Sequence, residues 1–289
     1  MQRIKGQLSE EEELAKQVLS WITCATRPLT MSELQHALAV EIEESNFDET
    51  NIIPVEDMVS VCAGLVTTEE ESGIISLVHY TAQEYFDRTR SDWFPDAEAE
   101  ITATCATYLS FNEFESGPCA TDDEFEERLR SYRLYDYAVH NWDCHAHKAS
   151  TIRPVVIDFL ESRLKVEAAC QGLMAIKIYS EHSNYSQEFP TQMTGLHLAA
   201  YLGVTEAISA LLERGAHIDS KDKYDRTPLS YAVEEGHEAI VKLLLAEKVD
   251  ADARDEERRT PLSYATDIGN EAIIKLFSAS IKAPNVHGE

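Results

Sequence analysis

One segment recurs three times toward the C-terminal end of this 289-residue chain. The copies begin at Thr194, Thr227 and Thr260, so they repeat with a constant 33-residue period. They read TGLHLAAYLGVTEAISALLERGAHID, TPLSYAVEEGHEAIVKLLLAEKVDAD and TPLSYATDIGNEAIIKLFSAS. A unit this short cannot bury its apolar face alone, so copies at a fixed period predict units that stack into a solenoid.

The residue types of the second copy predict two helices. Pro228 suits the first turn of a short helix, where its missing N–H has no helical partner. Gly236 suits the end of that helix, because glycine readily adopts the left-handed conformation. Ile240, Leu243 and Leu244 then follow the i, i+3, i+4 spacing of a helix with one buried face.

The period and the opening T-P-L together resemble the ankyrin repeat. The resemblance implies helix pairs over residues 191–282, a short tail at 283–289 and a surface that binds a protein partner. The signature histidine is present as His197 but is replaced by Ser230 and Ser263. Gly215–Ala216 becomes Glu247–Lys248, so we expect a looser second connection. Because three copies alone are marginal, we expect the preceding helices to cap the first copy.

The part of the chain before the repeats indicates helices and one hairpin. Apolar spacing predicts helices over Glu10–Ala25, Met31–Val40 and Pro54–Val61. Residues 65–68 and 73–78 flank an acidic turn with a glycine, which predicts a β-hairpin. Three helices followed by a hairpin is the order of a winged helix. Four strings fit the capping box at helix starts: Ser9-x-x-Glu12, Thr30-x-x-Glu33, Thr81-x-x-Glu84 and Thr121-x-x-Glu124.

Several strings carry a second resemblance. WITCATRPLTMSELQHALAVE, VEDMVSVCAGLV and GIISLVHYTAQEYF resemble the winged helix of fungal NACHT–ankyrin proteins, a type named for glycosylphosphatidylinositol inositol-deacylase. LYDYAVHNWDCHAHKAS resembles the helical segment that joins this winged helix to the repeats. The resemblance implies a mainly α fold with a winged-helix domain at 1–95, a helical connector at 96–190 and the ankyrin solenoid after it.

His79 is the one residue for which the resemblance implies a nucleotide role. In related signalling ATPases, a histidine in a V-H-x-x-x-Q-E-Y-like string reaches the phosphate of bound ADP, and His79 in VHYTAQEYF matches it. The closest glycines, Gly195 and Gly203, are separated by eight positions, which excludes a phosphate loop and a G-x-S-x-G nucleophile elbow. We therefore expect no cofactor, and a role for His79 only if a NACHT module is supplied in trans.

The net charge of −27 excludes some partners. Residues 1–95 hold 6 basic and 18 acidic side chains, and residues 191–289 hold 11 and 17. The third predicted helix, Pro54 to Ala63, has two acids and no base, so it cannot neutralise DNA phosphates. We expect no nucleic acid and no anionic membrane surface as a partner. A partner of the winged helix should present a basic face.

The cysteines and the N-terminal residues indicate the compartment. The six cysteines form no C-x-x-C pair and read as reduced thiols packed as small apolar residues. The N-terminal stretch has no apolar signal region, and no run approaches the length of a membrane helix. We expect a cytoplasmic protein, with the nucleus as an alternative.

Two further hypotheses assign chemistry to a group of histidines and one cysteine before the repeats. His140, Cys144 and His147 fall at i, i+4, i+7 with His145 beside them, so a zinc site is open. A Cys144–His140 nucleophile pair is also open, although no third orienting group is visible. The competing interpretation is an ordinary packed helix.

The exposed repeat loops 219–226 and 252–259 are the candidate binding elements. Tyr224, Arg226, Arg258 and Arg259 are the candidate anchors, because tyrosine and arginine are enriched where binding energy concentrates. Polar turns without a partner are the alternative. The sequence favours a non-enzymatic protein-interaction scaffold. A subunit that docks in trans on a NACHT-type ATPase is the second hypothesis, and an enzyme with an unrecognised site is the third.

Overall fold

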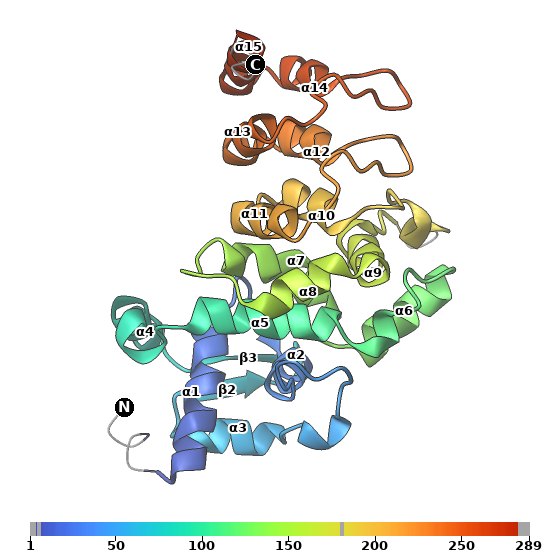
Figure 1. Cartoon of the computed structure of the whole chain (residues 1–289). Coiled ribbons are helices and arrows are strands. Elements are labelled where there is room, and N and C mark those ends of the chain that lie inside the picture. Colours follow the sequence, from blue (N-terminus) through green and yellow to red (C-terminus); the bar gives the residue numbers. More distant parts are fainter. Residues whose placement is uncertain (1–3, 5–6, 180–181, 283–289) are drawn as a thin grey trace. The chain divides into compact units, whose positions relative to one another are not determined.

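The computed structural model describes residues 4, 7–179 and 182–282. The chain is mainly helical, as predicted, and has one small three-stranded sheet (Figure 1). Its contacts divide it into two compact units, described separately below. The N-terminal unit comprises Met1–Glu113 and Asp122–Val155, and the repeat unit comprises Phe114–Thr121 and Val156–Glu289. No helix in the described ranges is long and apolar enough to cross a membrane.

The N-terminal unit begins with the predicted winged helix. Helices α1 (Ser9–Cys24), α2 (Met31–Leu38) and α3 (Val55–Val61) precede the hairpin of β2 (Val66–Glu69) and β3 (Ile74–Leu77). The hairpin is antiparallel, with Val66 opposite Leu77. A strand that was not predicted, β1 (Leu29–Thr30), pairs with β3 and completes the order β1-β3-β2. A strand of only two positions is too short to show an alternating pattern.

The capping boxes differ in outcome. Thr30 forms the full box: its hydroxyl accepts from the Glu33 N–H at 3.1 Å, and Glu33 accepts from the Thr30 N–H at 2.8 Å. The boxes at Ser9 and Thr81 are wrong, because α1 already begins at Ser9 and α4 (Tyr80–Trp93) begins before Thr81. The N–H of Val78 is bonded to the Leu65 carbonyl at 2.9 Å, so the helix starts directly where the sheet ends. Helix α6 (Asp122–Ser131) begins immediately after Thr121, as predicted.

Helix α5 (Ala97–Leu109) is the centre of the N-terminal unit. It is buried along most of its length and packs on α7 (Tyr135–Ala146). Its alanines, threonines and Cys105 are small, which allows the two helices to approach closely.

The start of α3 differs from the prediction. Pro54 was expected to be the first residue of this helix, but it precedes the helix and has extended backbone angles.

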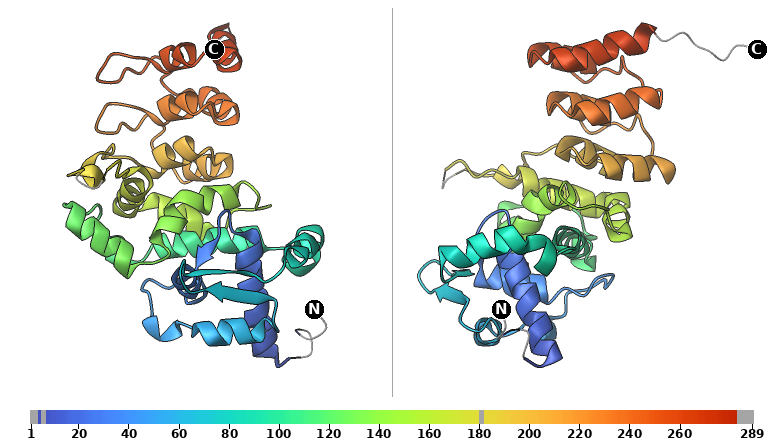
Figure 2. Two further views of the ribbon diagram at one scale, coloured as in Figure 1. Left: turned by 180° about the vertical axis from the view of Figure 1, so that it is seen from behind. Right: turned by 90° about the vertical axis from the view of Figure 1, so that its left-hand side faces the viewer.

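The repeat unit consists of stacked helix pairs, as the 33-residue period predicts (Figure 2). The pairs are α10 (Gly195–Leu202) with α11 (Thr205–Glu213), α12 (Pro228–Glu234) with α13 (Glu238–Ala246), and α14 (Pro261–Asp267) with α15 (Glu271–Lys282). The short helices α10, α12 and α14 pack in series. The predicted tail at 283–289 lies outside the described residues.

Helices before the first copy cap it, as predicted. Helix α9 (Arg163–Met174) packs on α10. The backbone of Leu160, in α8 (Pro154–Glu161), comes so close to α10 that a Cβ at Gly195 would lie 2.1 Å from its carbonyl oxygen. The division into three segments remains a prediction: the connector 96–190 contributes α5, α6 and α7 to one unit and α9 to the other.

Candidate functional site

The loops of the repeat unit form one continuous edge. The Lys223 N–H donates to the Thr191 carbonyl at 2.9 Å, and the Glu256 N–H donates to the Tyr224 carbonyl at 3.0 Å. The two donors are one repeat period apart, and so are the two acceptors, so one bond per repeat ties each loop to the loop before it. In Figure 1 these loops project from the same side of the short helices.

A buried aspartate holds each of the two later loops. Asp222 accepts from the Arg226 N–H at 2.8 Å and from the Tyr231 hydroxyl at 2.6 Å. Asp255 repeats this arrangement, with the Tyr264 hydroxyl at 2.6 Å. Burial and the bond to Asp222 raise the pKa of Tyr231, so its hydroxyl remains a donor. The first copy has buried apolar residues at the matching positions: Phe189, Met193 and Leu198.

Two arginines stack on the same tyrosines. The Arg226 guanidinium lies 4.0 Å from the centre of the Tyr231 ring and 5.0 Å from that of Tyr264. The Arg259 guanidinium lies 4.7 Å from the centre of the Tyr264 ring. We call Tyr231, Arg226, Tyr264 and Arg259 the Tyr–Arg ladder. Arg226 also forms an ion pair with Glu234, on α12.

The four predicted anchors lie on this edge but differ in exposure. Tyr224 is 41% exposed and Arg258 is exposed. The Arg259 side chain is 41% exposed, whereas that of Arg226 is only 15% exposed. Arg226 therefore joins two repeats, and Tyr224, Arg258 and Arg259 are the anchors that face solvent. Partner binding through them remains a prediction.

The loop tips keep an unusual backbone. Gln192, Asp225 and Arg258 have φ values of 66°, 59° and 64°, again one per repeat at the same position. Only glycine adopts this left-handed region at no cost. The tips therefore carry side chains where glycine would be the more stable residue. Lys248 takes the same conformation, with φ of 61°, at the connection where the first copy has Gly215.

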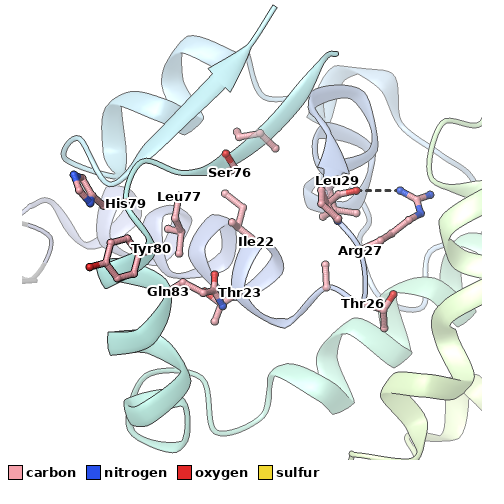
Figure 3. A pocket seen from close by; sticks show the side chains of 13 residues that line it. Ile22, Thr23, Thr26, Arg27, Leu29, Ser76, Leu77, His79, Tyr80 and Gln83 are labelled. Carbon is pink, nitrogen blue, oxygen red and sulfur yellow. Dashed lines mark hydrogen bonds between the residues drawn. The ribbon is translucent and has the colours of Figure 1, made fainter. Parts of the chain in front are cut away.

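His79 lies where β3 joins α4. It is exposed, and its side chain forms no capping bond with the helix. It lines two hollows of the N-terminal unit, of about 310 and about 500 Å³. Figure 3 shows the smaller one, with His79 and Tyr80 at one end and Arg27 at the other. The His79 side chain is therefore exposed to solvent at the start of α4.

The candidate zinc and nucleophile residues are dispersed. His145 is fully buried, whereas His140 is exposed and bonds to the Asp136 carbonyl at 2.9 Å. Burial raises the pKa of Cys144, which opposes the thiolate that a nucleophile needs. Across residues 4, 7–179 and 182–282, no three His, Cys, Asp or Glu side chains are gathered as metal ligands. None of the six cysteines, all of which the structure describes, forms a disulfide, and the four that are buried are Cys24, Cys62, Cys105 and Cys170.

A buried polar network was not predicted. Glu98, on α5, accepts hydrogen bonds from Arg90, on α4, and from His145, on α7, the latter at 2.5 Å. His145 bonds on its other side to the Tyr137 hydroxyl at 2.8 Å. Burial alone would raise the pKa of Glu98, but His145 and Arg90 hold it below its usual value. The bond between Glu98 and His145 joins residues 47 positions apart in the chain, so no local spacing reveals it.

Comparison with known families agrees with both halves of this architecture. Residues 3–103 match the family described as GPI inositol-deacylase, winged helix domain. Residues 166–255 and 196–287 match ankyrin repeats in three copies. The chain combines a GPI-inositol-deacylase-type winged helix with ankyrin repeats. Both resemblances predicted from the sequence are confirmed.

Curated relatives cover the chain in part. The "Azaphilone pigments biosynthesis cluster protein L" of Monascus ruber is 26% identical over 233 residues, which is 69% of this chain and 46% of that protein. "Rabankyrin-5" of Mus musculus is 42% identical over 50 residues, 17% of this chain and 4% of that protein. The chain thus spans less than half the length of these relatives. The ankyrin repeats indicate a protein-interaction module.

Proposed function

We propose that this chain is a non-enzymatic scaffold that binds a protein partner through the loop edge of its ankyrin repeats. The observation that carries the proposal is the bond from the Glu256 N–H to the Tyr224 carbonyl, with its counterpart at Lys223 and Thr191. These bonds hold the loops as one rigid edge. Side chains on such an edge bind without first losing much conformational entropy.

Charge distribution supports the same edge. Six of the eleven basic residues of 191–289 lie in the two loops 219–226 and 252–259. The same loops hold seven acidic residues, so they carry both charges and are close to neutral, whereas the rest of the chain is strongly acidic. Charges of both signs at fixed positions favour one orientation of a partner that carries the complementary pattern.

The test replaces the two most exposed anchors together, Tyr224→Ala with Arg258→Ala. Partners captured on the full chain are identified, and their affinity for the purified variant is measured. We expect a loss of at least about tenfold, because interface tyrosines and arginines often contribute more than about 1 kcal/mol each. The matched control is Lys242→Ala with Lys275→Ala, on exposed faces of α13 and α15. Equal affinity for the double variant and the control would refute the proposal.

His79 supports a second function, docking in trans on a NACHT-type ATPase. The observation is its exposed position between two hollows, with Val78 and Tyr80 exposed beside it. An exposed apolar and aromatic group is typical of a protein contact. The prediction is that such an ATPase co-purifies with the chain and that His79→Ala weakens the complex. A complex unchanged by His79→Ala would exclude this residue from the contact.

We propose no catalytic activity for this chain. The name of the winged-helix family refers to an enzyme, but the chain lacks the G-x-S-x-G elbow of many hydrolases. A metal analysis and a broad hydrolase screen on the purified chain test this directly. Metal bound at a fixed stoichiometry, or turnover of any substrate, would reopen the hypothesis of an unrecognised site.

We also propose a cytoplasmic location, with the nucleus as the alternative. The support is that none of the six cysteines, all within the described ranges, forms a disulfide, which suits a reducing compartment. Microscopy of a fluorescent fusion distinguishes the two compartments.

A further inference from the structure

Strand β3 has an open stretch on its side toward β1. In an antiparallel sheet, the N–H and C=O groups of a central strand turn alternately to its two neighbours. The Val78 N–H donates to the Leu65 carbonyl, on the β2 side. The Gly73 carbonyl accepts from the Met31 N–H, on the β1 side. This alternation turns the backbone groups of Leu77 toward β1.

No partner strand reaches Leu77, and the cause lies within the chain. The two residues of β1 pair with only the first two residues of β3. The residue before β1 is Pro28, which has no N–H with which to extend the pairing. Thr26 is turned away, since its N–H donates to the Tyr137 hydroxyl at 3.2 Å. In the part of the chain that the structure describes, no strand pairs with Leu77 on this side.

The open edge lines the smaller of the two hollows, of about 310 Å³ (Figure 3). Thr23, on α1, lines the same hollow. Thr23 is only 8% exposed, and its hydroxyl has no hydrogen-bond partner among the described residues. A buried hydroxyl without a partner costs free energy, which a ligand that bonds to it recovers. The hollow thus combines an open strand edge with an unpaired buried hydroxyl.

The charge in the lining is already compensated. The lining, which lies wholly within the described residues, contains no Asp or Glu, although residues 1–95 are strongly acidic. Arg27 donates to Glu33 at 2.6 Å and to Asp136 at 3.1 Å, so its charge has partners. A charged ligand would lose its water here without gaining a new ion pair. The hollow therefore favours an uncharged ligand.

We propose that this hollow binds an extended segment of a partner protein, which adds to β3 as a short antiparallel strand. A donor and an acceptor on the same strand residue match the backbone of another strand. One residue of the segment would exchange both main-chain hydrogen bonds with Leu77, as opposite residues of an antiparallel pair do. An uncharged polar side chain of the segment (Ser, Thr, Asn or Gln) would bond to Thr23. The site belongs to the winged helix and does not rest on the function proposed for the repeats or for His79.

The first experiment selects short peptides from a random display library on the full chain. Their binding to wild type, Thr23→Val and Thr107→Val is then measured by fluorescence anisotropy. Thr107 is the matched control: its hydroxyl is also buried and unpaired among the described residues, but it lies on α5, outside the hollow. Loss of one hydrogen bond should make Thr23→Val bind about fivefold more weakly, and Thr107→Val should change binding by less than about twofold.

The second experiment tests the main-chain bonds to Leu77. Each backbone nitrogen of the best peptide is methylated in turn. We expect one position at which methylation weakens binding at least about tenfold, because that N–H donates to the Leu77 carbonyl. The adjacent N–H groups turn away from β3, so their methylation should cost less than about threefold. The bound peptide should also slow hydrogen exchange of the Leu77 amide, measured by nuclear magnetic resonance.

Folding is controlled by thermal melting of both valine variants. Valine keeps the size of threonine and removes only an unpaired hydroxyl, so neither variant should melt earlier than wild type. If Thr23→Val does melt earlier, the methylated peptides decide the question, because they are measured on the wild-type chain.

Several outcomes would overturn the inference. Selected peptides that bind Thr23→Val as tightly as wild type, or that tolerate methylation at every position, would do so. A library without binders would refute it as well. Peptides that lose binding with the Tyr224 and Arg258 variants, but not with Thr23→Val, would support the loop edge of the repeats and refute this site. A dimer of the chain that Thr23→Val weakens would assign the open edge to a second copy instead.

Discussion

The two units of this chain bury their polar groups in different ways. The N-terminal unit has one network, in which Glu98 joins α4, α5 and α7 through Arg90 and His145. The repeat unit uses the same small arrangement twice: Asp222 with Tyr231, then Asp255 with Tyr264. The first network has no duplicate, whereas each copy of the second arrangement joins two residues only nine positions apart in the chain.

This difference has consequences for stability. Loss of one member of a unique buried network leaves the other members unpaired, and three helices lose their connection. Loss of one member in a repeat affects chiefly that repeat and its neighbour. The four predictions below test this comparison, from the largest expected effect to the smallest.

The largest effect is expected for Glu98→Ala. It leaves Arg90 and fully buried His145 without their shared carboxylate, which should lower the free energy of unfolding of the N-terminal unit by about 3 kcal/mol. All three tryptophans, Trp21, Trp93 and Trp142, lie in that unit, so urea unfolding followed by their fluorescence measures it.

The control for this variant lies on the same helix. Glu100 is 60% exposed and lies 3.8 Å from Arg153, so Glu100→Ala should change stability by less than about 0.5 kcal/mol. Similar costs for the two variants would show that the buried network is not what holds the unit together.

Gly195→Ala should lower the stability of the repeat unit nearly as much as Glu98→Ala lowers that of the N-terminal unit. The reason is that the backbone of Leu160 lies very close to Gly195. The new Cβ would lie 2.1 Å from the Leu160 carbonyl oxygen, so α10 must shift away from its cap at a cost of about 3 kcal/mol. Hydrogen exchange of α10 measures the loss. Gly215→Ala, which has open space but a φ of +88°, should cost only about 1 kcal/mol. The reverse order would contradict the capping role of α8.

The third prediction concerns pH. Burial lowers the pKa of His197 to about 4, and its bonds to the Thr194 N–H and the Arg226 carbonyl suit a neutral ring. The unfolded chain, with an ordinary histidine pKa of about 6.5, binds a proton first, so stability is full above that pH and falls as the pH drops toward 4. Between pH 7 and pH 5 the loss should be about 2 kcal/mol.

His197→Ser tests this with a residue that the other copies already use, Ser230 and Ser263. The pH dependence of unfolding in the repeat unit, measured by hydrogen exchange corrected for intrinsic rates, should become flatter. His36, whose burial also lowers its pKa to about 4, keeps its effect in the N-terminal unit. An unchanged slope in the repeats would show that His197 is not the titrating group.

The smallest expected effect is a gain in stability. Arg258→Gly removes a side chain from a left-handed position and should stabilise the third repeat by about 1 kcal/mol, measured as a shift in the urea midpoint. The same change should weaken partner binding, because Arg258 is a proposed anchor. Arg254→Gly, on the same loop but outside the left-handed region, should instead destabilise by about 0.5 kcal/mol. Stabilisation by both would refute the backbone argument.

Prediction from sequence succeeded where contacts are local or periodic. The helix pairs of the repeats and the Val66–Leu77 hairpin were predicted because each depends on spacing within a short window. It failed at Ser9 and Thr81, where the motif is present but the helix starts elsewhere. For α4, the end of β3 decides the start.

The candidate site was likewise predicted only in part. The four candidate anchors lie in the predicted loops, but Arg226 was predicted as an exposed tip and its side chain is only 15% exposed, close to the rings of Tyr231 and Tyr264. A signal for the ladder was available: Asp222, Arg226 and Tyr231 each recur one repeat later as Asp255, Arg259 and Tyr264. Recurrence shows that such residues act together, but not that a guanidinium lies between rings of two repeats.

By itself, the sequence determined the architecture: a winged helix followed by ankyrin repeats at a constant period, because spacing sets which side chains share a face. The tertiary structure alone decided which polar residues are buried and which remain available. It buried most of the Arg226 side chain, left that of Arg259 partly exposed, and brought Glu98 to His145 from a distant part of the chain. Burial of a charge depends on neighbours from distant segments, and their arrangement exists only in the folded chain.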